Sequence, residues 1–171
     1  MAINSEASDT ASVARGYFEA VTRRDVKAMA SFWEPGAPDV IHGVAEMRVP
    51  DDLEAWFGDL FRAFPDFRFE VLDLIASGEK AAVHWHATGS FNGTGRFEGL
   101  VPNGATVDVQ GCDVLSVREG RIQRNDAYMN GAEMARQLGA LPPAGSRAER
   151  GMTAGLNLKT RLAQWLRNRR G

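Results

Sequence analysis

A single carboxylate interrupts an apolar strand face in the segment from Gly104 to Asn130. This segment holds two strand-like runs joined by the turn signal Arg118-Glu119-Gly120. Every second residue of the first run lies on one face, and these residues are Val107, Val109, Gly111, Asp113, Leu115 and Val117. Because apolar surroundings disfavour a charged carboxylate, we expect the pKa of Asp113 to be raised. Asp113 is therefore a candidate functional residue, with a structural, hydrogen-bonded carboxyl group as the alternative.

Three histidines are the candidates for moving a proton near neutral pH. His42 is the last residue of the short strand-like run 39–42, and His84 and His86 alternate with Trp85 in a predicted strand at 81–88. If the histidine face of that strand lines a pocket, one of the pair is a general base. If Trp85 faces the pocket instead, both histidines lie on the outer or dimer-facing side of the sheet. No third side chain has metal-ligand spacing to the pair, so we predict neither a metal nor a cofactor.

Composition places the chain among ordinary globular proteins. It has 171 residues, 44% of them hydrophobic, and a net charge of −2, which gives no overall attraction for nucleic acid. Cys112 is the only cysteine, so no disulfide forms within the chain. No apolar run reaches the roughly 18 residues of a membrane span, and the polar start of the sequence is unlike a signal peptide. These features predict a cytoplasmic protein.

The elements that must position these residues follow an α+β order. Helical spacing of apolar residues predicts a first helix around Tyr17, a short one at 26–33, and a third after Pro50 with a stripe formed by Leu53, Trp56, Phe57, Leu60 and Phe64. Between the second and third helices lies the short strand at 39–42. From Phe67 onward the period changes to two, with a phase change at Leu72 that indicates a bulge. Helices against one face of a curved sheet would enclose a pocket.

The residues after position 142 differ in composition from those before. We therefore divide the chain into a domain at 1–142 and a basic tail at 143–171. Leu158, Leu162 and Trp165 recur at helical spacing, and no acidic residue follows Glu149. A helix packed on its own domain or on a dimer mate, or a frayed tail, is the favoured interpretation, and contact with an anionic membrane surface is the alternative.

Several motifs in this order resemble a known family. They are Gly-x-Asp-Val-Leu-Ser-Val-Arg-Glu-Gly-Arg-Ile at 111–122, the preceding turn Pro102-Asn103-Gly104, and the closing run Gln137-Leu138-Gly139-Ala140-Leu141-Pro142. The chain resembles the nuclear transport factor 2-like superfamily, in particular its SnoaL-like polyketide cyclase and ketosteroid isomerase branches. The resemblance implies a cone-shaped α+β fold, in which a curved antiparallel sheet wraps around N-terminal helices and encloses an internal pocket.

The resemblance to ketosteroid isomerases also implies roles for individual residues. Tyr17 falls at the family's oxyanion-hole tyrosine and Asp113 at its protonated aspartic acid. The general-base aspartate of that family falls at about Ile41, which cannot move protons, so His42 is the nearest titratable replacement. Candidate substrate-binding residues, for whose aromatic members core packing is the alternative, are Trp33, Trp56, Phe57, Trp85, Asn125 and Met129.

The cyclase and epoxide hydrolase branches match less well at their carboxylates. Their last-strand carboxylate falls at Ala127, between Asn125 and Asp126, and the Arg-x-Asp pair of epoxide hydrolases is replaced by the His84-Trp85-His86 run. Epoxide hydrolysis is accordingly disfavoured.

The expected function is cofactor-free acid–base chemistry on a small apolar carbonyl compound, by enolisation leading to isomerisation or cyclisation. Tyr17 and Asp113 would polarise the carbonyl group, and a histidine would move the proton. The alternatives are a non-catalytic module that binds a small hydrophobic ligand and a dimerisation domain. We expect a homodimer and no nucleic-acid partner.

Overall fold

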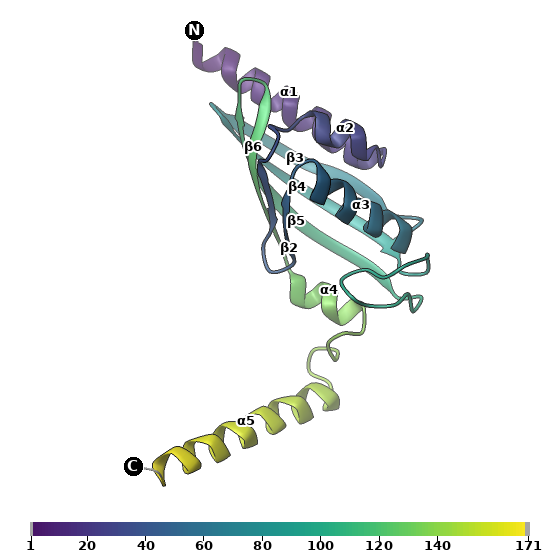
Figure 1. Cartoon of the computed structure of the whole chain (residues 1–171), viewed down its shortest axis with the longest axis vertical. Coiled ribbons are helices and arrows are strands. Elements are labelled where there is room, and N and C mark those ends of the chain that lie inside the picture. Colours follow the sequence, from purple (N-terminus) through teal and green to yellow (C-terminus); the bar gives the residue numbers. More distant parts are fainter. Residues whose placement is uncertain (1, 170–171) are drawn as a thin grey trace.

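The computed structural model describes residues 2–169 and consists of helices packed on a single mixed sheet (Figure 1). The elements, in chain order, are α1 (Ala2–Thr22), α2 (Val26–Ser31), β1 (Pro38–Ile41), β2 (Ala45–Arg48), α3 (Asp51–Ala63), β3 (Arg68–Ser77), β4 (Lys80–Ser90), β5 (Thr106–Arg118), β6 (Arg121–Met129), α4 (Gly131–Gln137) and α5 (Arg147–Asn168). The α+β order predicted from the sequence is confirmed, and β2 is an additional short strand.

The six strands form one curved, open sheet with the order β2-β1-β6-β5-β4-β3. Neighbouring strands are antiparallel except β1 and β6, which are parallel. This parallel pair places Asp39 beside Asn125 and Ile41 beside Ala127. The register of β3 shifts between Val71 and Asp73, as the phase change in the sequence predicted. The sheet therefore brings the short strand after α2 next to the last strand of the hairpin.

Alternation along the strands separates two faces of the sheet. On β4 the buried residues Val83, Trp85 and Ala87 face α1 and α3, while His84 lies on the opposite, exposed face. On α1 the buried stripe contains Tyr17, and on α3 it contains Leu53, Phe57 and Leu60. We call the helix-covered side the inner face of the sheet and the other side its outer face. The core lies between the inner face and these helices (Figure 1).

The tail forms a long helix that stands away from the rest of the chain (Figure 1). Ser146 caps α5, because its side chain accepts a hydrogen bond from the backbone N–H of Glu149. Glu149 also pairs with Arg136 of α4 at 3.1 Å, which fixes the base of α5. No described residue of α5 is buried. None of the described helices is long and apolar enough to cross a membrane.

Removal of the tail should leave the fold intact. A chain ending at Ala144 keeps the whole sheet and the buried faces of α1 and α3, because α5 contributes no buried side chain. We expect cooperative thermal unfolding with a midpoint within a few degrees of the full chain, measured by circular dichroism. Loss of the cooperative transition would contradict this expectation.

Candidate active site

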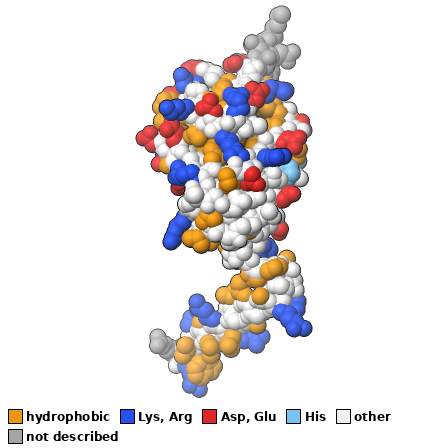
Figure 2. Space-filling model, turned by 90° about the vertical axis from the view of Figure 1, so that its right-hand side faces the viewer, with side chains coloured by type: hydrophobic (Ala, Val, Ile, Leu, Met, Phe, Trp, Pro, Cys, Tyr) orange, Lys and Arg blue, Asp and Glu red, His pale blue; other side chains and the backbone are white. Residues whose placement is uncertain are grey.

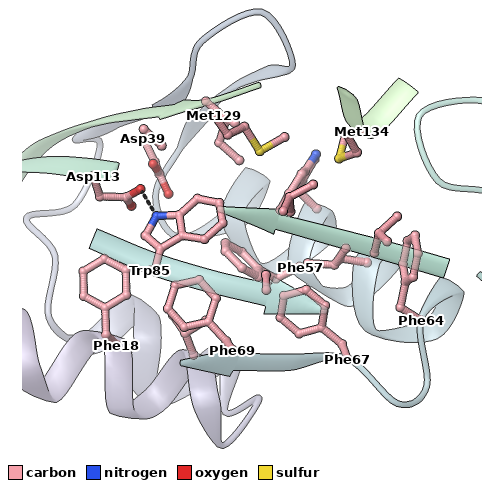
Figure 3. Close-up of a pocket in the computed structure, with 18 of the residues that line it drawn as sticks. Phe18, Asp39, Phe57, Phe64, Phe67, Phe69, Trp85, Asp113, Met129 and Met134 are labelled. Atoms are coloured by element: carbon pink, nitrogen blue, oxygen red, sulfur yellow. Dashed lines mark hydrogen bonds between the residues drawn. The ribbon is translucent and has the colours of Figure 1, made fainter. Parts of the chain in front are cut away.

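A cavity of about 100 Å³ lies between the inner face of the sheet and the helices α1 and α3 (Figure 3). Apolar side chains make up most of its wall, and the polar residues that line it are Tyr17, Asp39, Asp113 and Asn125. Asp39 and Asp113 lie together at one end of the cavity, whereas Phe64 and Met134 lie toward the other end (Figure 3). The site is thus an apolar cavity whose charge-bearing groups are gathered at one end.

One amide group joins the two carboxyl groups. The Nδ2 atom of Asn125 donates one hydrogen bond to Asp39 Oδ1 at 3.0 Å and another to Asp113 Oδ2 at 2.7 Å. Asp39 is 2% exposed, Asp113 6% and Asn125 1%, so all three are shielded from bulk water. The parallel pairing of β1 with β6 and the antiparallel pairing of β6 with β5 bring the three residues together. Asp39 and Asp113 therefore form a buried carboxyl pair.

Burial raises the pKa of both members of this pair. For Asp39, burial and then the nearby charge of Asp113 raise the pKa from 3.8 to about 7, although the hydrogen bond from Asn125 opposes the rise. For Asp113, burial raises the pKa to about 6, and the hydrogen bonds from Trp85 and Asn125 oppose the rise. Because the two groups interact, they titrate as a pair. Near neutral pH, the pair is poised to hold one proton.

The second donor to Asp113 is the indole of Trp85, which depends on a glycine. Trp85 Nε1 donates to Asp113 Oδ1 at 2.7 Å (Figure 3). To reach it, the indole lies over Gly111, which is the residue opposite Trp85 on β5. A Cβ atom at Gly111 would overlap the Trp85 ring and lie 2.7 Å from the carbonyl oxygen of Tyr128. This close approach gives the glycine of the Gly-x-Asp motif a physical role.

Tyr17 is the third titratable group in the cavity. Its side chain is buried on α1 and lines the cavity. Burial, and after it the negative charges of Asp39 and Asp113, raise the pKa of Tyr17 well above its usual range, and Trp33 partly offsets the rise. The hydroxyl group consequently stays protonated at neutral pH and can donate a hydrogen bond into the cavity.

The structure places most of the predicted binding residues in the cavity wall. The side chains of Trp56, Phe57, Trp85, Asn125 and Met129 line it. Trp33 is the exception, because it is buried in the core behind Tyr17, with the two rings edge to face at 5.6 Å. Asn125, expected only as a polar contact, is the residue that joins the carboxyl pair.

The histidines lie on the outer face, which corrects the expectation of a histidine base. His42 pairs with Asp126 at 2.9 Å, and the hydrogen bonds of His84 and His86 go to Gln110 at 3.2 Å and to Asp108 at 2.8 Å. The cause is strand alternation: Trp85 takes the inner position on β4, so its two neighbours face outward. Ile41 likewise lines the cavity, and His42, next to it, points away.

Asp39 is a residue of the site to which the sequence assigned no role. Asp39 lies two residues before Ile41, so alternation along β1 puts both on the inner face. The signal was present in the sequence, because the family's base position at about Ile41 predicts which face of this strand is the inner one. The neighbour of Asp39 in the site, Asn125, becomes visible only through the strand pairing.

Comparisons with known proteins agree with this architecture. Residues 11–138 match the family model of the SnoaL-like polyketide cyclases. AclR from Streptomyces galilaeus, a proposed hydroxylase, superposes with a TM-score of 0.69 at 20% identity, over 96% of this chain and 98% of its own. IdmH from Streptomyces antibioticus, a proposed polyketide cyclase, superposes with a TM-score of 0.60 at 24% identity, over 76% of this chain and 98% of its own. A proposed ketosteroid isomerase from Kribbella flavida superposes with a TM-score of 0.57 at 18% identity, over 83% of this chain and 87% of its own.

All three identities are below 25%, so these structural similarities show the fold alone. The match to AclR leaves out fewer residues than the 22 of α5, so it reaches into the tail helix. No curated protein matches the chain.

The carboxyl pair should make stability fall as the pH rises. Both folded-state pKa values lie above the unfolded value of 3.8, so the stabilisation is complete below about pH 4 and is lost as the pH passes through 6 and 7. We expect the unfolding free energy of the wild type, measured in urea, to decrease over this range relative to Asp39→Asn. The exposed change Asp73→Asn is the control and should follow the wild type. Parallel profiles for the wild type and Asp39→Asn would refute a raised pKa.

Gly111→Ala should displace the Trp85 indole. Because the new methyl group would overlap the ring and approach backbone, we expect a loss of about 1–3 kcal/mol in unfolding free energy. The pKa of Asp113 should rise further, since a donor that stabilises its charged form is withdrawn. Carboxyl NMR titration and urea unfolding measure the two effects. Gly131→Ala, with open space around the new Cβ atom, is the matched control.

Proposed function

Since the chain belongs to the SnoaL-like polyketide cyclase family, we propose that it catalyses proton transfer on a small, largely apolar carbonyl compound. The observation that carries the proposal is the Asp39–Asp113 pair, held by Asn125 at one end of an apolar cavity. Two buried acids that share one proton near neutral pH supply a base and an acid in the same place.

The number of hydrogen bonds that each aspartate accepts distinguishes the general base from the protonated acid. Asp113 accepts two hydrogen bonds, from the N–H groups of Trp85 and Asn125, whereas Asp39 accepts one hydrogen bond, from Asn125. Donors stabilise the charged form, so the negative charge of the pair resides mainly on Asp113. We therefore assign Asp113 as the general base and Asp39 as the protonated partner. This assignment replaces the earlier expectation that Asp113 is a neutral donor.

In the proposed step, the carbonyl oxygen of the substrate accepts a hydrogen bond from the Tyr17 hydroxyl. A C–H bond next to the carbonyl breaks, and its proton passes to a carboxylate oxygen of Asp113. The electron pair of that bond forms the new C–C double bond, and the carbonyl π electrons move to oxygen. Tyr17 stabilises the resulting enolate because it is neutral and already placed in a dry site.

The enolate then reacts in one of two ways, and neither adds atoms to the substrate or removes atoms from it. Return of the proton from Asp113 to a different carbon gives an isomer. Attack of the enolate carbon on a second carbonyl group of the same molecule closes a ring, and the new alkoxide takes a proton from the carboxyl pair. In both cases the apolar wall keeps water away from the enolate.

The size of the cavity limits the ligand that fits without a change of structure. A cavity of about 150 Å³ in another protein holds one benzene ring, so the roughly 100 Å³ here is close to the volume of a single ring. A larger ligand requires side chains of the wall to move. Trp56 is half-buried and tied to Glu98 by a hydrogen bond of 2.9 Å, which makes it a candidate for such a movement.

Exchange of the α-hydrogens of small cyclic ketones in D₂O provides a test that does not need the natural substrate. We expect the wild type to accelerate exchange and both Asp39→Asn and Asp113→Asn to reduce it at least 100-fold, about the lower limit for a general base. His84→Gln, on the outer face, is the control and should equal the wild type. Tight ketone binding without any exchange would favour a non-catalytic binding module.

Phenols should bind better than ketones of the same shape, because they mimic the enolate held by Tyr17. Tyr17→Phe keeps the ring and removes the donor, so it should weaken phenol binding by about 1–3 kcal/mol. An apolar ligand without oxygen should bind both proteins equally. Calorimetry measures these affinities, and equal affinity of both proteins for the phenol would make Tyr17 a purely structural residue.

A further inference from the structure

Residues 95–102 form a flap near the ends of α3 and α4 (Figure 1). Backbone hydrogen bonds fix the chain on either side of it. Before the flap, the N–H of Gly93 donates to the carbonyl oxygen of Ala63 at 3.0 Å, and after it the N–H of Gly104 donates to that of Phe91 at 2.8 Å. Within the described part of the chain, the backbone hydrogen bonds of the flap itself are internal to it. The flap can therefore move while the sheet and the helices stay in place.

A tight turn sets the direction of the side chains in the flap. Phe97 and Leu100 exchange two backbone hydrogen bonds, at 3.1 and 2.9 Å. Between them, Glu98 has a φ of 48° and Gly99 a φ of 78°, which is the pattern of a type I′ turn. The side chain of Phe97 is 4% exposed, and that of Glu98 is exposed. The turn thus holds one aromatic ring inward and one carboxylate at the surface.

Phe97 closes the cavity at the end away from the carboxyl pair. Its ring lines the cavity and contacts the rings of Trp56 and Phe64, edge to face, with centroids 5.4 and 5.6 Å apart. Phe64 lies at the opposite end of the cavity from Asp113 (Figure 3). The neighbouring walls are a strand ladder and two helices, whereas the flap is held at its ends. A ligand larger than the cavity therefore meets its weakest wall at Phe97.

One hydrogen bond fastens the flap across this end. The Nε1 atom of Trp56, on α3, donates to Glu98 Oε1 at 2.9 Å. Among the described residues, it is the one hydrogen bond between the flap and the rest of the chain. Trp56 is half-buried and also lines the cavity, so the bond joins a fixed wall to the flap. Because Glu98 is exposed, water can replace the indole as its partner when the flap opens.

We propose that the flap is the entrance of the cavity, that the Trp56–Glu98 hydrogen bond holds it closed, and that Phe97 sets the largest ligand that fits beneath it. With Phe97 in place, the cavity of about 100 Å³ takes a single ring. With Phe97 displaced, fused two-ring ligands fit. Uncharged atoms form most of the surface of the domain next to α5 on the side where the flap lies, which suits the approach of an apolar ligand (Figure 2). Access through the flap is independent of whether the acids inside transfer protons.

The exchange of 4-fluorophenol between free and bound states, followed by fluorine NMR line shapes, tests the latch. Trp56→Phe removes the donor and Glu98→Ala the acceptor, so both should speed uptake and release by about three- to tenfold, the change expected from one hydrogen bond. The double variant should be no faster than either single one, because both changes break the same bond. Glu98→Gln keeps an acceptor oxygen and should stay close to the wild type. Glu79→Ala, which removes an exposed carboxylate paired with Arg118, is the matched control.

Calorimetry with phenol and 2-naphthol tests the size limit. Phe97→Ala should raise the affinity for 2-naphthol relative to phenol by about tenfold, because the second ring replaces the lost side chain. Phe97→Leu, a smaller truncation, should shift the ratio in the same direction. Phe61→Ala removes a partly buried ring of α3 that does not line the cavity, so it should keep the ratio of the wild type. Circular dichroism checks that each variant is folded.

Three results would overturn the proposal. They are unchanged exchange rates in both Trp56→Phe and Glu98→Ala, an unchanged affinity ratio in both Phe97 variants, and failure of Phe97→Ala to bind either ligand. Faster exchange in the latch variants of a protein that does not exchange the α-hydrogens of ketones would have a different meaning. It would support the flap and remove only the proposed catalysis.

Discussion

The site depends on one amide that holds two carboxyl groups in an apolar cavity. Asn125 gives one N–H to Asp39 and the other to Asp113, so both acids keep a partner although neither reaches bulk water. Burial raises both pKa values, and Asp113 accepts one more hydrogen bond than Asp39 does. Without the amide, Asp39 would have no hydrogen-bond donor and Asp113 would keep only the Trp85 indole, at a large desolvation cost. Much of the surrounding fold keeps these three residues in register.

That register is set by strand pairing and by a glycine. The parallel β1–β6 pair aligns Asp39 with Asn125, and β5 places Asp113 opposite Ala127, which is two residues from Asn125 along β6. Gly111 leaves room for the Trp85 indole to cross β5 and reach Asp113. A one-residue slip in any of these strands would turn a site residue to the outer face. Fold and chemistry therefore rest on the same alignment.

The two faces of the sheet carry different chemical groups. Its inner face carries the carboxyl pair, and the histidines, which are the usual candidates for proton transfer near neutral pH, lie outside in contact with carboxylates and an amide. The outer face carries exposed apolar side chains, among them Ile75 and Tyr128, together with the half-buried Cys112. Alternate residues of the same strands therefore have different surroundings, buried on the inner face and more exposed on the outer one.

From the sequence alone, much of the domain was predictable. Periodicity gave the α+β order, the bulge in β3 and the inward position of Asp113, because these depend on local spacing. Resemblance led to the family and to Tyr17. The facing of the histidines stayed open, since alternation defines two faces without saying which one the helices cover. The Asp39–Asn125–Asp113 contact depended on residues 12 and 86 positions apart, and only tertiary strand pairing brings such distant residues within hydrogen-bonding distance.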